Sequence, residues 1–158
     1  MELVNKLAFN NIINLKSISD KNIKLEKILK KKFKFDNFFN NYEKILTDED
    51  IDVVLILTSM NEHASITKEA LKNKKHVLVE KPMSTNMKDL KELFLWAKKS
   101  KTYLVAAPFV VLSPTFQAIH QDINKNKIGN ISLARARYGW SGPDWGKRDY
   151  ETGGGPLF

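Results

Sequence analysis

The chain has 158 residues, of which 42% are hydrophobic and 28% charged, a composition typical of a globular domain and not of a disordered chain. It contains no cysteine, which excludes disulfides and thiolate metal sites. No apolar run approaches the ~20 residues of a membrane span, and the first residues lack the pattern of a secretory signal. We therefore expect a cytoplasmic protein with no membrane partner.

The chain is basic, with a formal net charge of +8 and a pI of about 9.5. Such values also occur in nucleic-acid-binding proteins. However, lysine supplies most of the positive charge, and the only arginines are Arg135, Arg137 and Arg148. Base and phosphate recognition favours the planar guanidinium of arginine. We therefore expect the lysines to be spread over solvent-exposed faces, and we do not expect nucleic acid as the partner.

The first third of the chain predicts short helices on either side of one strand. Apolar residues at helical spacing predict a helix over residues 1–11, and the run from Ile12 to Ser19 predicts a strand that ends at Asp20. A second helix is expected over residues 22–32, with Ile23, Leu25, Ile28 and Leu29 facing inward. An aromatic-rich segment at residues 33–39 and a short helix at residues 42–46 follow.

The middle of the chain alternates strands and helices. Residues 53–57 form an unbroken aliphatic run, which predicts a strand buried on both faces. A helix follows, with Ile66, Ala70 and Leu71 on one face, and residues 76–79 form a second buried strand that ends before Pro82. Ser84 or Thr85 is expected to cap the next helix, whose apolar stripe is Leu90, Leu93, Phe94 and Ala97, and residues 103–107 form a further strand. This alternation predicts right-handed βαβ units in a doubly wound parallel sheet.

The pattern changes after Pro108. A helix is expected over residues 114–127, containing Phe116, Ile119 and Ile123, and Gly129 marks the turn after it. Residues 131–138 alternate apolar and polar side chains, which predicts a strand with one buried face, the first of a second, antiparallel sheet. We place the boundary between the two domains near residues 108–113.

Three segments carry a family pattern. The first runs from Asp48 to Thr58 and is followed by His63, and the second runs from Lys74 to Pro82. The third covers residues 127–131 and is followed by the Gly-rich tail at residues 153–158. In this order and spacing they resemble the glucose–fructose oxidoreductase / inositol dehydrogenase family, also written Gfo/Idh/MocA.

The resemblance implies an α/β fold in two domains. Residues 1–110 would form a partial dinucleotide-binding domain with a Rossmann-type, doubly wound parallel sheet. Residues 111–158 would begin a substrate and oligomerisation domain with a mixed or antiparallel sheet. The implied activity is an NAD(P)-dependent oxidation of a hydroxyl group, or reduction of a ketone, on a sugar or cyclitol. The complete protein is expected to form a homo-oligomer.

The sequence departs from the family pattern at both ends. Family members begin with a strand and a G-x-G-x-x-G turn that cradles the cofactor pyrophosphate at a helix N-terminus. This sequence contains no such motif, and Met1 falls within the helix that should follow it. The chain also stops before the helix that carries an Asp and a His near the substrate in the family. We therefore expect a fragment, with a non-catalytic nucleotide-binding remnant or a partner-dependent subunit as the alternative.

The resemblance identifies Lys81 as the catalytic residue. It follows a predicted strand, at the edge where open α/β sheets bind ligands, and a lysine there can assist proton transfer during hydride transfer. The alternative interpretation is that Lys81 is an ordinary solvent-exposed lysine without a catalytic role. Glu80 is expected to orient Lys81 or to accept from the nicotinamide ribose, and Pro82 is expected to follow a cis peptide bond that directs Lys81 into the cleft.

Glu80, Lys81 and Pro82 are also assigned to cofactor binding, and so are the remaining candidates. Thr58, Ser59 and Asn61 follow the first buried strand, and His63 matches a family histidine, with a structural hydrogen bond as the equally weighted alternative. Asp20 can accept both hydroxyls of the adenosine ribose, which favours NAD over NADP, although the neighbouring Lys21 weakens that preference. The three histidines show no metal-ligand spacing, so no metal is expected.

Overall fold

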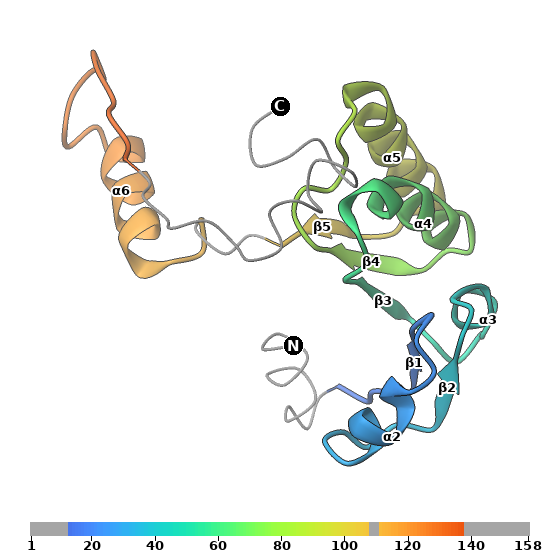
Figure 1. Cartoon of the computed structure of the whole chain (residues 1–158). Coiled ribbons are helices and arrows are strands. Elements are labelled where there is room, and N and C mark those ends of the chain that lie inside the picture. The colour runs from blue at the N-terminus through green and yellow to red at the C-terminus, as the bar shows by residue number, and fades with distance from the viewer. Residues whose placement is uncertain (1–12, 108–110, 138–158) are drawn as a thin grey trace.

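The computed structural model describes residues 13–107 and 111–137 (Figure 1). Strands and helices alternate along nearly all of this part of the chain. Their order is β1 (Ser17–Ser19), α2 (Leu25–Lys30), β2 (Asn37–Phe39), α3 (Glu43–Leu46), β3 (Val53–Ile56), α4 (Met60–Lys72), β4 (His76–Val79), α5 (Met87–Ser100), β5 (Leu104–Ala106) and α6 (Pro114–Asn124).

The strands form two parallel sheets. One contains β1 and β2, and the other has the order β3–β4–β5. Leu78 at the centre of β4 pairs with Leu55 on one side and Val105 on the other. Helices connect the successive parallel strands, as a parallel sheet requires. The expected α/β fold with Rossmann-type parallel pairing is confirmed.

Helices α4 and α5 pack against each other, and α4 also packs on β3 and β4. The buried residues of α4 occupy one helical stripe, because they recur at intervals of three and four residues. This stripe consists of His63, Ile66, Thr67, Ala70 and Leu71. Leu93 of α5 and Val77 and Val79 of β4 complete the centre of the core.

The sequence predicted β4 with its observed bounds, and it located β3, α3, α4 and α5. Helix α5 is capped by Asn86, whose side chain accepts from the backbone N–H of Lys88, and not by Ser84 or Thr85 as expected. Ser84 instead hydrogen-bonds with the backbone of Asn86 and supports the turn before the cap. The prediction misjudged the cap because several capping residues stand in succession and only the turn geometry chooses among them.

Several burial predictions were wrong. Val53 of β3 is 59% exposed, so the strand is not buried on both faces. Phe94, Ile28 and Ile23 are also exposed, although the patterns placed them inward. The physical reason is that an apolar side chain is buried only where another element packs on it. In the described residues, α4 is the helix packed against β3.

The C-terminal strand prediction was also wrong. Residues 131–137 form no strand, and Leu133 is 70% exposed. A strand requires a hydrogen-bonded neighbour, and no described strand pairs with this segment. Strand β2, by contrast, was missed within the aromatic segment at residues 33–39. The predicted helix at residues 1–11, Tyr138 and the Gly-rich tail lie outside the described residues.

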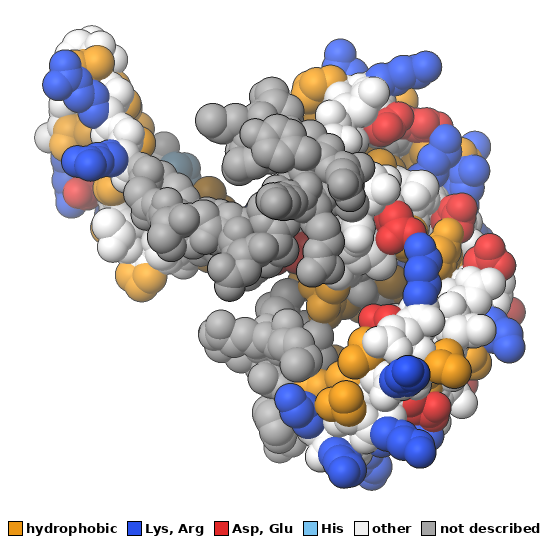
Figure 2. Space-filling model, in the orientation of Figure 1, with side chains coloured by type: hydrophobic (Ala, Val, Ile, Leu, Met, Phe, Trp, Pro, Cys, Tyr) orange, Lys and Arg blue, Asp and Glu red, His pale blue; other side chains and the backbone are white. Residues whose placement is uncertain are grey.

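Figure 2 shows Lys and Arg side chains scattered over the visible face, with Asp and Glu side chains between them. This distribution matches the expectation that the lysines cover solvent-exposed faces. In the described part of the chain, no helix is both long and apolar enough to cross a membrane.

We expect the two leucines of α5 to differ sharply in their contribution to stability. Leu93 is 1% exposed and Leu95 is 68% exposed. Leu93→Ala should lower the free energy of unfolding by about 2–5 kcal/mol, because it leaves a cavity between α5 and the core. Leu95→Ala should change it by no more than about 0.5 kcal/mol. Urea denaturation followed by circular dichroism measures both, and equal losses would contradict the observed packing of α5.

Candidate functional site

The parallel pairing of β3 and β4 brings two turns to one edge of the sheet. Ile56 at the end of β3 pairs with Val79 at the end of β4. The backbone N–H of Glu80 then donates to the carbonyl oxygen of Ile56 at 2.9 Å and extends this ladder. The turn after β3 and the turn after β4 therefore leave the sheet together, at the carboxyl edge where open α/β sheets bind ligands.

The turn after β4 holds the backbone of Lys81 and leaves its side chain exposed. A carboxylate oxygen of Glu80 accepts from the backbone N–H of Lys81, and the Lys81–Pro82 peptide bond is cis, as the family resemblance implied. Within the described residues, no hydrogen bond or ion pair engages the ammonium group of Lys81. In residues 13–107 and 111–137, Lys81 is thus exposed at the carboxyl edge of the sheet.

His63 joins the two turns. Its side chain is 1% exposed and lies in the buried stripe of α4. Nδ1 lies 2.7 Å from the carbonyl oxygen of Pro82, and Nε2 lies 3.0 Å from the carbonyl oxygen of Thr58. Both ring nitrogens thus face the protein's own backbone. The sequence left a cofactor-binding role and a structural hydrogen bond as equal alternatives for this histidine, and the structure shows contacts with two backbone carbonyl oxygens.

The turn after β3 presents polar side chains beside the start of α4. Thr58, Ser59 and Asn61 are all exposed. Ser59 occupies the N-cap position of α4, but its side chain makes no capping hydrogen bond. Within the part of the chain that the structure describes, these exposed side chains lie next to the positive end of the α4 dipole.

Asp20 lies directly after β1, at the carboxyl end of the other sheet. One of its carboxylate oxygens accepts from the backbone N–H of Asn22 at 2.7 Å, and the side chain is exposed. Lys21 then pairs with Glu62, with 2.6 Å between Nζ and Oε1. Because Glu62 lies in the first turn of α4, this ion pair brings the end of β1 next to the turn that contains Thr58 and Ser59.

A second ion pair links the amino ends of the two sheets. Lys16 precedes β1 and pairs with Asp50, which precedes β3. The hydrogen bond with Lys16 is the largest cause that lowers the pKa of the Asp50 carboxyl group below its ordinary value, and the same bond raises the pKa of Lys16. In residues 13–107 and 111–137, no group of three or more His, Asp or Glu side chains is arranged to hold a metal ion.

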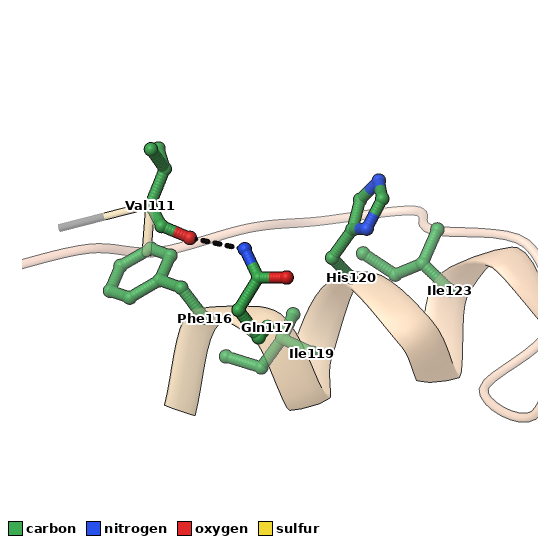
Figure 3. Close-up of a pocket in the computed structure, with 6 residues that line it drawn as sticks. All are labelled: Val111, Phe116, Gln117, Ile119, His120 and Ile123. Carbon is green, nitrogen blue, oxygen red and sulfur yellow. Dashed lines mark hydrogen bonds between the residues drawn. The ribbon is translucent and has the colours of Figure 1, made fainter. Parts of the chain in front are cut away.

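A separate hollow lies along α6, apart from the sheets (Figures 1 and 3). The side-chain amide of Gln117 donates to the carbonyl oxygen of Val111 across it. Its lining is largely apolar and consists of Val111, Phe116, Gln117, Ile119, His120 and Ile123. The helical spacing of Phe116, Ile119 and Ile123 was the signal in the sequence for this face. None of the candidate site residues lies here.

Comparison with known proteins gives one family match over most of the chain. A family model described as "Oxidoreductase family, NAD-binding Rossmann fold" matches residues 3–107. The trans-1,2-dihydrobenzene-1,2-diol dehydrogenase of Danio rerio is 30% identical over 101 residues, which cover 64% of this chain and 30% of that protein.

Solved structures match the same fold. Levoglucosan dehydrogenase in complex with NADH and levoglucosan is 25% identical, with a TM-score of 0.70 over 80% of this chain and 35% of its own. The apo scyllo-inositol dehydrogenase of Lactobacillus casei has a TM-score of 0.75 over 82% of this chain and 39% of its own, at 18% identity. This chain therefore spans between 30% and 39% of the length of these three proteins.

We expect Lys16→Met to raise the pKa of Asp50 back toward its ordinary value of 3.8. Because the folded-state pKa of Asp50 is lowered, the pair contributes stability above the unfolded-state pKa and loses it as pH falls through the folded-state pKa. NMR titration of the Asp50 carboxyl carbon in the native chain and in Lys16→Met measures the shift, with Lys24→Met as the exposed control. An identical Asp50 titration in the native chain and in Lys16→Met would show that the ion pair does not form in solution.

Proposed function

Because the chain belongs to the Gfo/Idh/MocA oxidoreductase family, which has an NAD-binding Rossmann fold, we propose that it contributes to the catalytic centre of an NAD(P)-dependent oxidoreductase. The substrate is a sugar or cyclitol, and the reaction oxidises one of its hydroxyl groups or reduces the corresponding ketone. The observation that carries this proposal is the exposed ammonium group of Lys81 on a backbone held by Glu80 and the His63 contacts. The levoglucosan complex of a family relative supports the substrate class.

Lys81 assists the proton transfer in this reaction. When a hydroxyl group is oxidised, its carbon loses a hydride and its oxygen loses a proton, and a cation beside that oxygen stabilises the developing alkoxide. As the proton moves from the hydroxyl oxygen to the Lys81 amine, the ammonium group that forms is that cation, and in the reverse direction it donates the proton to the ketone oxygen. The nicotinamide, when bound, supplies the acceptor or donor of the hydride.

The cofactor lies along the carboxyl edges of β1 and β3. The exposed side chain of Asp20 is placed to accept from the adenosine ribose, and Thr58, Ser59 and Asn61 approach the remainder of the dinucleotide. NAD is favoured over NADP because the Asp20 carboxylate can accept from both ribose hydroxyls, and the neighbouring Lys21 forms an exposed ion pair with Glu62.

The chain divides into a dinucleotide-binding part, residues 1–110, and the beginning of a second domain, residues 111–158. The hollow on α6 and the exposed Leu133 are apolar surfaces that this second domain would cover. The complete protein forms a homo-oligomer, and the sheet of that second domain provides the interface between its subunits.

A non-catalytic role is the second candidate. The sequence contains no G-x-G-x-x-G turn, and this turn supplies much of the pyrophosphate contact in Rossmann folds. The chain would then be a nucleotide-binding remnant, or a subunit that requires a partner.

We expect the 158-residue chain by itself to bind NAD with a dissociation constant above about 1 mM, because the pyrophosphate-binding turn is missing from the sequence. Isothermal titration calorimetry measures this, with levoglucosan dehydrogenase titrated in parallel as the positive control. A sub-millimolar constant would show that Asp20 and the turn after β3 hold the cofactor without that turn.

We expect Lys81 to be required for turnover in a chimera in which residues 13–107 replace the matching segment of levoglucosan dehydrogenase. Lys81→Met should lower kcat by about 100-fold or more. It should change the dissociation constant for NAD by less than about threefold, because Lys81 acts on the substrate oxygen. Lys91→Met, at an exposed position of α5, is the matched control.

Steady-state kinetics with a panel of sugars and cyclitols provide the measurement. An unchanged kcat in Lys81→Met would remove Lys81 from the mechanism. A folded chimera that binds NAD but turns over no substrate with Lys81 intact would favour the non-catalytic role.

A further inference from the structure

The two sheets run in the same direction, but in the described residues no strand of one pairs with a strand of the other. At their amino ends, Lys16 before β1 pairs with Asp50 before β3. At their carboxyl ends, Lys21 after β1 pairs with Glu62 in the first turn of α4. Figure 1 shows β1 as the strand of its sheet that lies nearer to β3. Strands β1 and β3 are therefore parallel neighbours without a ladder of hydrogen bonds between them.

Strand β3 has a free edge on the side away from β4. The carbonyl oxygens of Asp52 and Ile56 accept from backbone N–H groups of β4 and of the residue that follows it, each at 2.9 Å. Alternate residues of a strand direct their backbone groups to opposite edges. The N–H and C=O groups of Val53 and Leu55 are therefore directed away from β4, and no described strand pairs with them.

Strand β1 has a matching free edge on the side away from β2. The Lys16 carbonyl oxygen accepts from β2 at 3.2 Å, and the Asp20 N–H donates to the last residue of β2 at 3.1 Å. By the same alternation, the backbone groups of Ser17 and Ser19 are directed away from β2. Because β2 and β4 occupy the outer sides, the free edges of β1 and β3 face each other.

The separation of β1 and β3 suits one additional strand. Hydrogen-bonded strands lie about 4.8 Å apart, and the long stems of the two bridging lysines can span the roughly 9–10 Å of two such spacings. Helix α3 fixes this separation from one face, because it contacts β1 while its Leu46 belongs to the same core cluster as Ile56. Tyr42, which precedes α3, donates to Glu69 of α4 at 3.1 Å and holds α3 in place.

We propose that the free edges of β1 and β3 bind one extended strand of a second polypeptide, parallel to both. Unpaired strand edges are templates for such pairing. The added strand completes a continuous sheet in the order β2–β1–added strand–β3–β4–β5, and the doubly wound order 3-2-1-4-5-6 likewise has a strand at this central place. Central strands of parallel sheets are buried on both faces, so the partner segment is aliphatic along its length.

Neither terminal segment of these 158 residues fits this place. A parallel strand joined directly to β1 requires a crossover of about a dozen residues or more. Residues 1–12 are too few for both a strand and that crossover, and residues 13–16 form no helix or strand. Residues 138–158 are rich in glycine and contain no run of four aliphatic residues. The proposal goes beyond the catalytic function, because pairing at these edges does not involve Lys81.

The experiment measures amide hydrogen exchange by NMR on the ¹⁵N-labelled 158-residue chain, with and without the peptide acetyl-KKTVIVAVTKK-amide at about 1 mM. We expect the N–H groups of Ser19, Val53 and Leu55 to exchange at least about tenfold more slowly with the peptide. The N–H groups of Ile18 and Val54 already face β2 and β4, so their exchange should change little.

Proline variants provide the matched controls, because proline has no N–H to donate. A peptide with proline in place of its isoleucine should give no slowing. Val53→Pro removes one N–H from the free edge at the first residue of β3, a position that tolerates proline, and should weaken peptide binding at least about tenfold. Ala106→Pro removes an N–H from the outer edge of β5 and should leave binding unchanged.

Three results would overturn the proposal. Slow exchange at Ser19 and Val53 without peptide would show that residues 1–12 or a second copy of the chain already occupy the edges. Slowing on β1 alone or on β3 alone would exclude insertion between them. Equal slowing at Ala106 would show unspecific strand addition. If Val53→Pro does not fold, the exchange pattern of the native chain still decides.

The two proposals fail separately, because the chimera measures kcat and the peptide experiment measures strand pairing. Absence of slowing together with a large loss of kcat in the Lys81→Met chimera would remove the strand site and leave the catalytic function. Slowing on both edges with an unchanged kcat in Lys81→Met would retain the strand site and remove Lys81 from the mechanism.

Discussion

The parallel pairing of β3 with β4 is the constraint from which the candidate site follows. Parallel strands in register end at the same level, so the pairing of Ile56 with Val79 compels the two following turns to leave the sheet side by side. The bond from the Glu80 N–H to the Ile56 carbonyl carries this pairing into the second turn. Lys81 therefore stands beside the start of α4 because of the sheet register, although the two segments are separated along the chain.

Helix α4 serves the core and the site through one stripe of side chains. Ile66, Ala70 and Leu71 pack into the core, and His63 continues the same stripe toward the sheet edge. An amphipathic helix buries every side chain on its covered face, so a histidine at this position enters the protein whatever its role. The backbone carbonyls at the two turns then give its buried polar atoms their partners.

The sequence predicted those elements whose burial is decided locally. Residues 76–79 are a short run that ends at the turn before Pro82, and the stripe of α4 recurs at regular intervals, so their patterns indicated the correct structure. Phe94 and the segment 131–137 failed because their burial depends on what another element covers, which a local pattern does not record. For the site, the family pattern selected Lys81, but the contacts of His63 join residues that lie 5 and 19 positions apart in the sequence, and only the fold brings them together.

The attachment of the β1–β2 sheet to the rest of the protein depends on α3 more than on the ion pairs that bridge the sheets. Exposed pairs such as Lys21 with Glu62 contribute about 0–1 kcal/mol each. Leu46 of α3 is 2% exposed and belongs to the same core cluster as Ile66, and burial of a leucine on this scale is worth about 2–5 kcal/mol by truncation. Helix α3 also contacts β1, so it links the core to the strand that Asp20 follows. A cofactor that reaches from Asp20 to the turn after β3 would span both sheets, and its binding energy would then hold them together where the exposed ion pairs are weak.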